Sequence, residues 1–88
     1  MKFEELLNSP IHIQIIEFFD QNPASIDTPR GVAAWINSDR ETVKKALTEL
    51  VELNILIEYR ATATTGYGYT SNQAILKKIK KYLSNIKK

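Results

Sequence analysis

Residues 28–54 limit the possible folds more than any other segment, because they predict two short helices separated by a two-residue turn. The second helix should begin at a capping box over residues 38–41. There the Ser38 hydroxyl accepts the backbone N–H of Glu41, and the Glu41 carboxylate accepts the N–H of Ser38. Asn54 should end this helix, since asparagine tolerates a left-handed backbone better than most residues other than glycine.

The second predicted helix has one buried face and one exposed face. Its apolar residues recur at the spacing of a single buried stripe, at Val43, Ala46, Leu47, Leu50 and Leu53. The residues that then point outward include basic and hydroxyl side chains, and they are Glu41, Lys44, Lys45, Thr48 and Glu52. Such an outward face is typical of a helix-turn-helix that reads DNA, so any function of the segment should lie there.

Length and composition restrict the size of the fold and the kinds of site it can hold. With 88 residues and 43% hydrophobic content, the chain can close one modest core, which predicts a single domain over residues 1–88. There is no cysteine and one histidine, so a metal site would depend on carboxylates, and a reducing, cytoplasmic compartment fits. No apolar run approaches the roughly 20 residues of a membrane helix, and the N-terminus does not resemble a signal peptide.

The distribution of charge is more informative than the net charge of +2. Residues 72–88 carry six lysines and no acid, whereas residues 1–71 carry six basic and ten acidic residues. An acidic body weakens a simple electrostatic argument for binding nucleic acid. Five of the six basic residues of the body nevertheless fall in one stretch of sequence, at Arg30, Arg40, Lys44, Lys45 and Arg60. A local basic face on an acidic body is therefore predicted.

The segment before residue 28 predicts one helix and one very short strand. A short amphipathic turn is expected around Phe3, Leu6 and Leu7. Ser9 and Pro10 then form an N-cap followed by proline, which favours a helix to about Asp20 over the strand that alternating isoleucines would also fit. Residues 25–27 can add a one-bridge strand. Thr28 and Pro29 repeat the cap-and-proline pattern and predict a helix through about Ile36.

The sequence period changes after the second helix of the motif. Residues 55–62 alternate between two faces and are rich in β-branched and aromatic residues, which predicts a strand. One face carries Ile55, Ile57 and Tyr59, and the other carries Leu56, Glu58 and Arg60. A threonine-rich tip over residues 62–66 leads to a second short strand over residues 67–70, so the two should form a hairpin. Residues 72–88 predict an amphipathic helix with lysines on its polar side.

These periodicities also predict which side chains fill the core. The expected core residues are Ile15, Phe18, Phe19, Ile26, Val32, Trp35, Ile36, Val43, Leu47, Leu50 and Ile57. Tyr67 and Tyr69 are expected to pack on the hairpin, although these two rings and Trp35 could instead stack on bases or a ligand. His12 has no second histidine or cysteine to work with, and its expected place is partly exposed on a helix.

The run VKKALTELVELNILIEYRAT followed by YGYTSN resembles the winged helix-turn-helix superfamily of bacterial and archaeal regulators, with the MarR-like and ArsR-like groups nearest. The resemblance covers about residues 9–71 and implies a mostly α fold: a three-helix core, a two-stranded wing and a C-terminal helix over residues 72–88. Two features depart from the family pattern. Asn54 stands where glycine is usual, and the wing tip over residues 63–66 lacks the arginine that such wings often insert into the minor groove.

By this resemblance the second helix of the motif lies in the major groove of duplex DNA. Arg40 would read guanine, lysines and hydroxyls would hold phosphates, and Arg30 would meet the backbone. The expected DNA-binding residues are Arg30, Ser38, Arg40, Thr42, Lys44, Lys45, Thr48 and Arg60. The alternative is that these are ordinary solvated positions, and Glu41 and Glu52 on the same face favour it.

The resemblance also implies a homodimer, in which the N-terminal and C-terminal helices share an interface. Its residues would be Phe3, Leu7, Ile79, Tyr82, Leu83 and Ile86. The C-terminal lysines could contact phosphate or a membrane surface, or could simply be the solvated side of a helix. These lysines are Lys77, Lys78, Lys80, Lys81, Lys87 and Lys88.

Two functions remain open at this point. The first is sequence-specific binding of double-stranded DNA as a small prokaryotic transcriptional regulator. The second is a winged-helix module that docks another protein within a larger assembly. The sequence has no glycine-rich phosphate loop, serine elbow or spaced acidic pair, so we predict neither an enzyme nor a cofactor.

Overall fold

Proline at the first position of α1 (Pro10–Gln21) and α2 (Pro29–Ile36), and asparagine in the left-handed region after α2 and α3 (Arg40–Glu52), set the limits of these helices. The computed structural model describes residues 1–86, and the side chains of Leu7 and Ile86 lie outside that description. Its elements are a 3₁₀ helix η1 (Phe3–Asn8), α1 (Pro10–Gln21), β1 (Ile26–Asp27), α2 (Pro29–Ile36), α3 (Arg40–Glu52), β2 (Leu56–Arg60), β3 (Thr65–Tyr69) and α4 (Gln73–Ile86). Asn37 follows α2 with φ 55° and Asn54 follows α3 with φ 62°, as expected for αL residues after helices.

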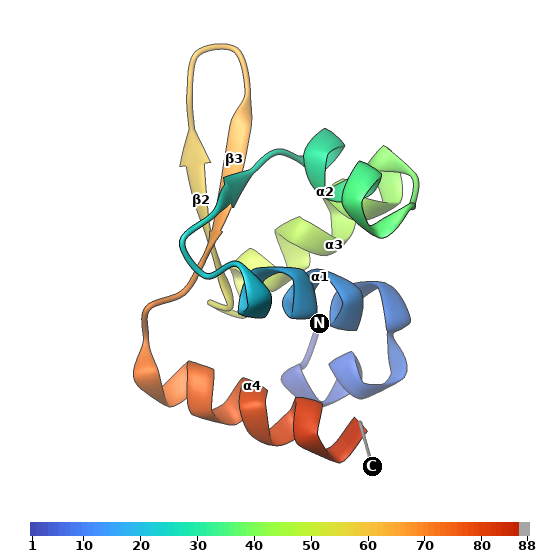
Figure 1. Ribbon diagram of the computed structural model, residues 1–88, viewed down its shortest axis with the longest axis vertical. Coiled ribbons are helices and arrows are strands. Elements are labelled where there is room, and N and C mark those ends of the chain that lie inside the picture. Colours follow the sequence, from blue (N-terminus) through green and yellow to red (C-terminus); the bar gives the residue numbers. More distant parts are fainter. Residues whose placement is uncertain (87–88) are drawn as a thin grey trace.

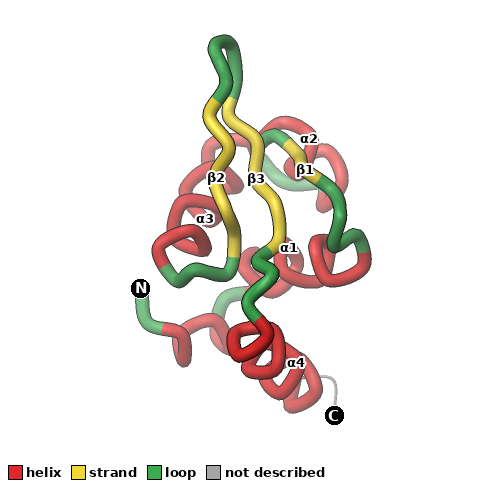
Figure 2. Tube along the Cα trace, turned by 90° about the vertical axis from the view of Figure 1, so that its left-hand side faces the viewer, coloured by secondary structure: helices red, strands yellow, loops and turns green. Residues whose placement is uncertain are grey.

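The strands form one antiparallel sheet in the order β1-β3-β2, packed against the helices (Figures 1 and 2). The hairpin of β2 and β3 pairs Leu56 with Tyr69 at its base and Arg60 with Thr65 near its tip. Its tip projects beyond the helices, while α4 lies at the other end of the molecule (Figure 1). This is the winged helix-turn-helix fold that the sequence predicted, and the short strand β1 at residues 26–27 is confirmed as well.

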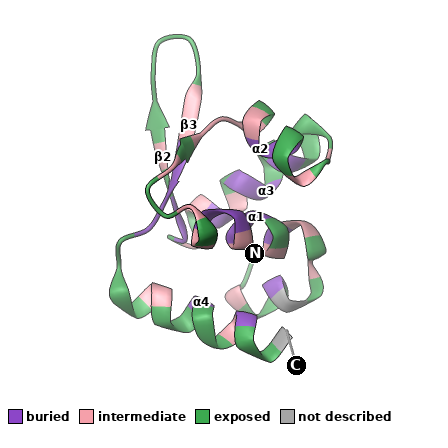
Figure 3. Ribbon diagram, viewed as in Figure 1, coloured by how far each residue is buried: buried purple, intermediate pink, exposed green. Residues whose placement is uncertain are grey.

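The buried core lies between α1, α2, α3 and the inner face of the sheet, and it continues between α1, η1 and α4 through Leu6, Ile79 and Leu83 (Figure 3). Seven of the predicted core residues are buried: Ile15, Phe18, Phe19, Val32, Val43, Leu47 and Leu50. Ile36 packs against them at intermediate burial. Three predictions were wrong, because Ile26, Trp35 and Ile57 are 60%, 65% and 40% exposed.

The error at Ile57 comes from the phase of strand β2. Ile55 is buried, but it belongs to the turn after α3, where its N–H donates to the Leu50 carbonyl, so it does not define a strand face. The inward phase starts one residue later, at Leu56. Because residues paired across antiparallel strands share a face, buried Tyr69 lies inward with Leu56.

The outward face of the sheet carries apolar side chains over two glycines of β3. Ile26 and Ile57 both pair with Gly68, and Tyr59 pairs with Gly66. A Cβ on Gly68 would lie 3.0 Å from Cε2 of Tyr59, and one on Gly66 would lie 2.8 Å from Cγ2 of Ile26. The glycines therefore let these two side chains lie across the central strand, which covers part of their apolar area without burying them.

Trp35 is exposed because α2 is short and turns other residues to the core. Val32 and Ala33 are its buried residues, and Trp35 lies at the margin of that stripe. Its ring still contacts the ring of Phe18, with a centroid distance of 5.4 Å. The indole therefore caps the edge of the core instead of filling it.

His12 is buried and not partly exposed as predicted, with 7% of its surface accessible. It lies on the α1 face that also carries Ile15, Ile16 and Phe19. Its Nε2 is 3.0 Å from Oε1 of Glu49 on α3, and its Nδ1 contacts the Ser9 hydroxyl. These two partners satisfy the ring and tie α1 to α3, which makes burial of a polar side chain tolerable.

The apolar side of α4 is covered by η1 and α1 of the same chain. Ile79 and Leu83 are 1% and 8% exposed, and the rings of Phe3 and Tyr82 lie 5.0 Å apart. Four of the residues assigned to a dimer interface thus pack within one chain, while Leu7 and Ile86 fall outside the described side chains. Among residues 1–86, no helix is both long and apolar enough to cross a membrane.

Candidate functional site

Asp39, and not Ser38, caps the N-terminus of α3. Its carboxylate accepts the backbone N–H groups of Glu41 at 3.1 Å and Thr42 at 3.0 Å, and it also accepts the Thr42 hydroxyl. The predicted capping box was wrong because the Ser38 N–H donates to the Ala33 carbonyl at 2.9 Å, which places Ser38 in the turn that closes α2. The hydrogen bonds from Thr42 and Glu41 lower the pKa of Asp39.

The start of α2 is held by a second local arrangement. The Thr28 hydroxyl accepts the N–H of Gly31 at 3.1 Å, and Oδ1 of Asp27 accepts the N–H of Thr28 at 2.9 Å. A Cβ on Gly31 would lie 2.0 Å from that same Asp27 oxygen, so a side chain here would displace the carboxylate. This cap presents Arg30, the second residue of α2, to solvent.

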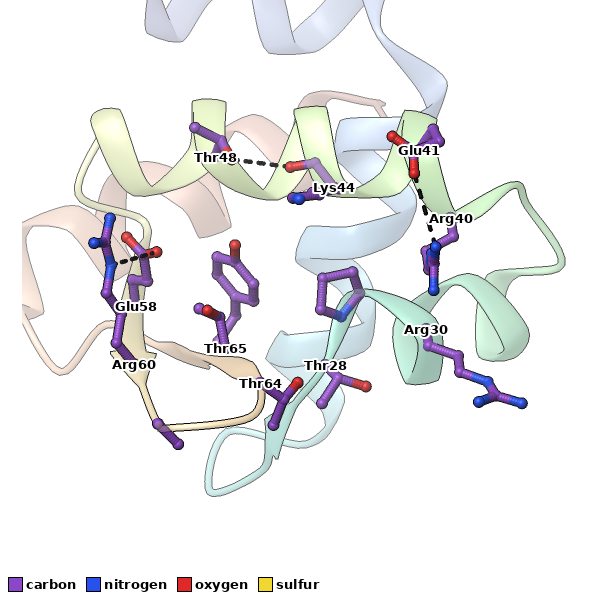
Figure 4. Close-up of a pocket in the computed structure, with 13 residues that line it drawn as sticks. Thr28, Arg30, Arg40, Glu41, Lys44, Thr48, Glu58, Arg60, Thr64 and Thr65 are labelled. Carbon is purple, nitrogen blue, oxygen red and sulfur yellow. Dashed lines mark hydrogen bonds and ion pairs between the residues drawn. The ribbon is translucent and has the colours of Figure 1, made fainter.

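The outer face of α3, the N-terminus of α2 and the hairpin enclose an open groove of about 870 Å³ (Figure 4). The three segments are far apart in sequence, and the fold brings them together. The lining residues are Thr28, Pro29, Arg30, Arg40, Glu41, Lys44, Thr48, Glu58, Arg60, Ala61, Thr64, Thr65 and Tyr67.

Five of the eight predicted site residues line this groove, and they are Arg30, Arg40, Lys44, Thr48 and Arg60. Ser38, Thr42 and Lys45 do not. Thr42 donates its hydroxyl to Asp39, and Lys45 lies on an adjoining stretch of α3. All of the predicted outward residues of α3 are exposed, which confirms the phase assigned to this helix.

Sequence reasoning missed the hydroxyl groups that the groove gains from other elements. Thr28 enters as the cap of α2, and Thr64 and Thr65 enter from the hairpin. Tyr67 is 4% exposed and forms part of the groove wall. Burial, followed by the nearby Glu58 carboxylate, raises the pKa of Tyr67, so its phenol stays protonated. The pairing of Tyr67 with Glu58 in the hairpin register is the feature that could have placed Tyr67 in the groove wall.

The charges of the groove are mixed but favour cations. Arg30, Arg40, Lys44 and Arg60 line it together with two carboxylates, Glu41 and Glu58. Formally the groove carries two positive charges in excess, on a body that is acidic through residue 71. A concave surface lined by cations and hydroxyl groups is suited to contact anions such as phosphodiesters.

The turn of the hairpin over residues 61–64 has no charge. Residues 61–64 are alanine and threonine, they are exposed, and the Ala61 N–H closes the turn on the Thr64 carbonyl at 2.9 Å. The cation nearest the tip along the hairpin is therefore Arg60, at the end of β2. Any strong electrostatic contact by the hairpin must come from Arg60, just before the tip.

Comparison with known proteins supports the fold. No protein-family model matches the chain. No curated protein matches it by sequence either. Solved structures do match. A possible transcriptional regulator from Methanosarcina mazei Go1 superposes with a TM-score of 0.74 at 19% identity, over 90% of this chain and 71% of that one.

Two further solved structures share the architecture. The antimony-specific transcriptional repressor AntR superposes with a TM-score of 0.66 at 16% identity, over 85% of this chain and 65% of its own. The ST1889 protein from the thermoacidophilic archaeon Sulfolobus tokodaii gives a TM-score of 0.69 at 23% identity, over 89% and 75% of the two chains. At these identities the likeness extends to the fold, and function must be argued from the groove.

Proposed function

We propose that the chain binds double-stranded DNA through this groove, in a sequence-specific manner, as a small prokaryotic transcriptional regulator. The observation that carries the proposal is the meeting of Arg30, Arg40, Lys44 and Arg60 from three separate segments at one concave surface. Chance placement of solvated cations gives no reason for such convergence in a body that is otherwise acidic.

The geometry suggests how duplex DNA would be held. The major groove is about 12 Å wide and admits an α-helix, and the outward residues of α3 are exposed. Arg40 is the first residue of α3 and could reach a guanine edge, while Lys44 and Lys45 would meet phosphates. Arg30 and the hydroxyl groups of the groove would then contact the sugar-phosphate backbone on either side.

A regulatory role is supported by the structural relatives, two of which are described as a possible transcriptional regulator and a transcriptional repressor. The proposal therefore includes a single winged-helix domain over residues 1–88, without catalytic activity, acting in the cytoplasm. We also propose a homodimer, because a DNA-binding protein with two-fold symmetry contacts two half-sites and gains specificity from both. Since Ile79 and Leu83 are already covered and the rings of Phe3 and Tyr82 pack on one another, the dimer would use the part of these two rings that stays exposed.

The test of the proposal is the salt dependence of binding to duplex DNA. Fluorescence anisotropy with labelled genomic fragments should show affinity that falls steeply from low to physiological salt, because phosphate contacts release counterions. Sedimentation of the protein with and without DNA reports the oligomeric state in the same samples. A protein that binds no duplex even at low ionic strength would contradict the proposal.

The second candidate, a protein-docking module, is favoured by a different observation. Ile26, Ile57 and Tyr59 form an exposed apolar patch on the outward face of the sheet, on the side away from the helices. Replacing Ile57 and Tyr59 with serine should leave DNA binding unchanged if the groove is the functional surface. If the protein instead co-purifies with a partner from a native extract, and these two changes abolish the complex, docking is the better account.

A further inference from the structure

We propose that Glu41 and Glu58 set the sequence selectivity of the groove by holding two of its arginines in ion pairs. This inference rests on the proposed binding of duplex DNA and assigns a role to the carboxylates of the same site. Carboxylates that line a phosphate-binding surface weaken it, so their presence there needs a reason.

The two ion pairs lie on opposite sides of the groove (Figure 4). On the hairpin, Nε of Arg60 is 3.2 Å from Oε1 of Glu58. At the start of α3, Nη2 of Arg40 is 4.0 Å from Oε1 of Glu41. Among the described residues, Arg30 and Lys44 form no such pair. Half of the cations of the groove are thus paired before any ligand arrives.

This arrangement separates binding to any duplex from binding to a preferred duplex. A phosphate that approaches Arg40 or Arg60 also meets a carboxylate, so the sequence-independent attraction is reduced. At a matching site the arginine gains a directed contact, such as the bidentate contact of Arg40 with guanine, while Glu41 can accept from a cytosine amino group. The contacts of a matching sequence offset the free energy lost when the ion pair breaks. An unmatched sequence makes no such contacts and therefore binds more weakly.

The hairpin pair should have the larger effect of the two. The Glu58 side chain is 30% exposed and the Glu41 side chain is 78% exposed. A carboxylate that is partly shielded from water interacts more strongly with a neighbouring charge than a fully solvated one. Glu58 is also fixed by its place in β2 opposite Tyr67.

The experiment compares E58Q and E41Q with the unchanged protein on two labelled duplexes. One duplex is a preferred site selected by the unchanged protein from a random library, and the other is an unrelated sequence of equal length. At low salt, E58Q should raise affinity for the unrelated duplex about threefold or more, and the ratio of the two affinities should fall. E41Q should also raise the affinity for the unrelated duplex and lower the ratio of the two affinities, but each change should be smaller than for E58Q.

Glu4 supplies the matched control, because it is exposed on η1, outside the groove. E4Q makes the same change in net charge, and screening should leave its effect well below that of E58Q. The double variant E58Q/R60Q should lose the gain of E58Q, since that gain depends on releasing Arg60. The glutamate-to-glutamine changes keep side-chain size, Arg60 is exposed, and circular dichroism checks the folding of all variants.

Two different failures can be told apart. If the unchanged protein selects a site but E58Q does not raise affinity for the unrelated duplex, or E58Q/R60Q retains the gain, this inference is overturned and the proposed function stands. If the unchanged protein binds no duplex at low salt, both are overturned. A gain for E4Q equal to that for E58Q would also overturn the inference, because net charge would then explain it.

Discussion

The basic residues of this protein fall in two regions that differ in shape and in partners. On α4 the exposed lysines lie along one convex helix face, and within residues 1–86 none of them is within ion-pair distance of a carboxylate. In the groove, cations from three segments face a common space, and two of the four are paired. Helix α4 carries more lysines than the groove, yet it is the groove that has the concave geometry of a binding site. Convergence of side chains, more than their number, distinguishes a binding surface from a solvated helix face.

Although the two regions differ at the surface, they rest on one continuous core. Leu47 lies beneath the groove and Ile79 lies beneath the α4 lysines, at 0% and 1% exposure. We expect Leu47→Ala and Ile79→Ala each to lower the free energy of unfolding by about 2–5 kcal/mol, as core truncations do. Urea denaturation measures this, with Lys80→Ala as a surface control expected to stay within about 0.5 kcal/mol. An unchanged midpoint for Ile79→Ala would show that α4 is separable from the domain.

The two surfaces should respond differently when lysines are removed. The slope of log affinity against log salt is negative. Lys44→Ala and Lys45→Ala should each reduce its magnitude by about one, because each removes a phosphate contact. Lys80→Ala and Lys81→Ala on α4 should leave that slope unchanged. Titration of one duplex at several salt concentrations provides the measurement. Equal losses of slope for the two pairs would remove the distinction between the regions.

The smallest expected effect concerns the cap that presents the groove face of α3. Because hydrogen bonds lower the pKa of Asp39 in the folded state, its contribution to stability is full above the ordinary value of 3.8 and is lost as pH falls through the lowered pKa. Asp39→Ala should therefore lower the melting temperature at neutral pH, and the difference should shrink at pH values below 3.8. Ser38→Ala is the control, since Ser38 does not cap the helix. A larger loss of melting temperature for Ser38→Ala than for Asp39→Ala would support the capping box predicted from the sequence.

Local sequence patterns were sufficient to predict the features that depend on neighbouring residues in the sequence. The prolines at residues 10 and 29, the αL residue Asn54 and the apolar stripe of α3 predicted the helices and the exposed face that carries Lys44. Lys44 and Thr48, two of the five predicted residues that line the groove, could be found because that face follows from helical periodicity. The fold class followed from the order of these elements.

Other features were decided by contacts between distant segments. Ile57 and Trp35 are apolar, and nothing in their local sequence shows that β2 starts its inward phase at Leu56 or that α2 turns Trp35 to the margin of the core. His12 is buried because Glu49, on another helix, accepts its N–H. The groove likewise exists only once the hairpin is folded beside α3, which brings Tyr67 and Glu58 to face Lys44.

The sequence by itself therefore determined the helices, the hairpin and the outward side of α3, because these depend on period, capping and turn residues. The tertiary structure decided which apolar side chains are covered and where cations converge. The physical reason is that burial and the convergence of side chains depend on distances between elements, and these distances are set by packing and not by position along the chain.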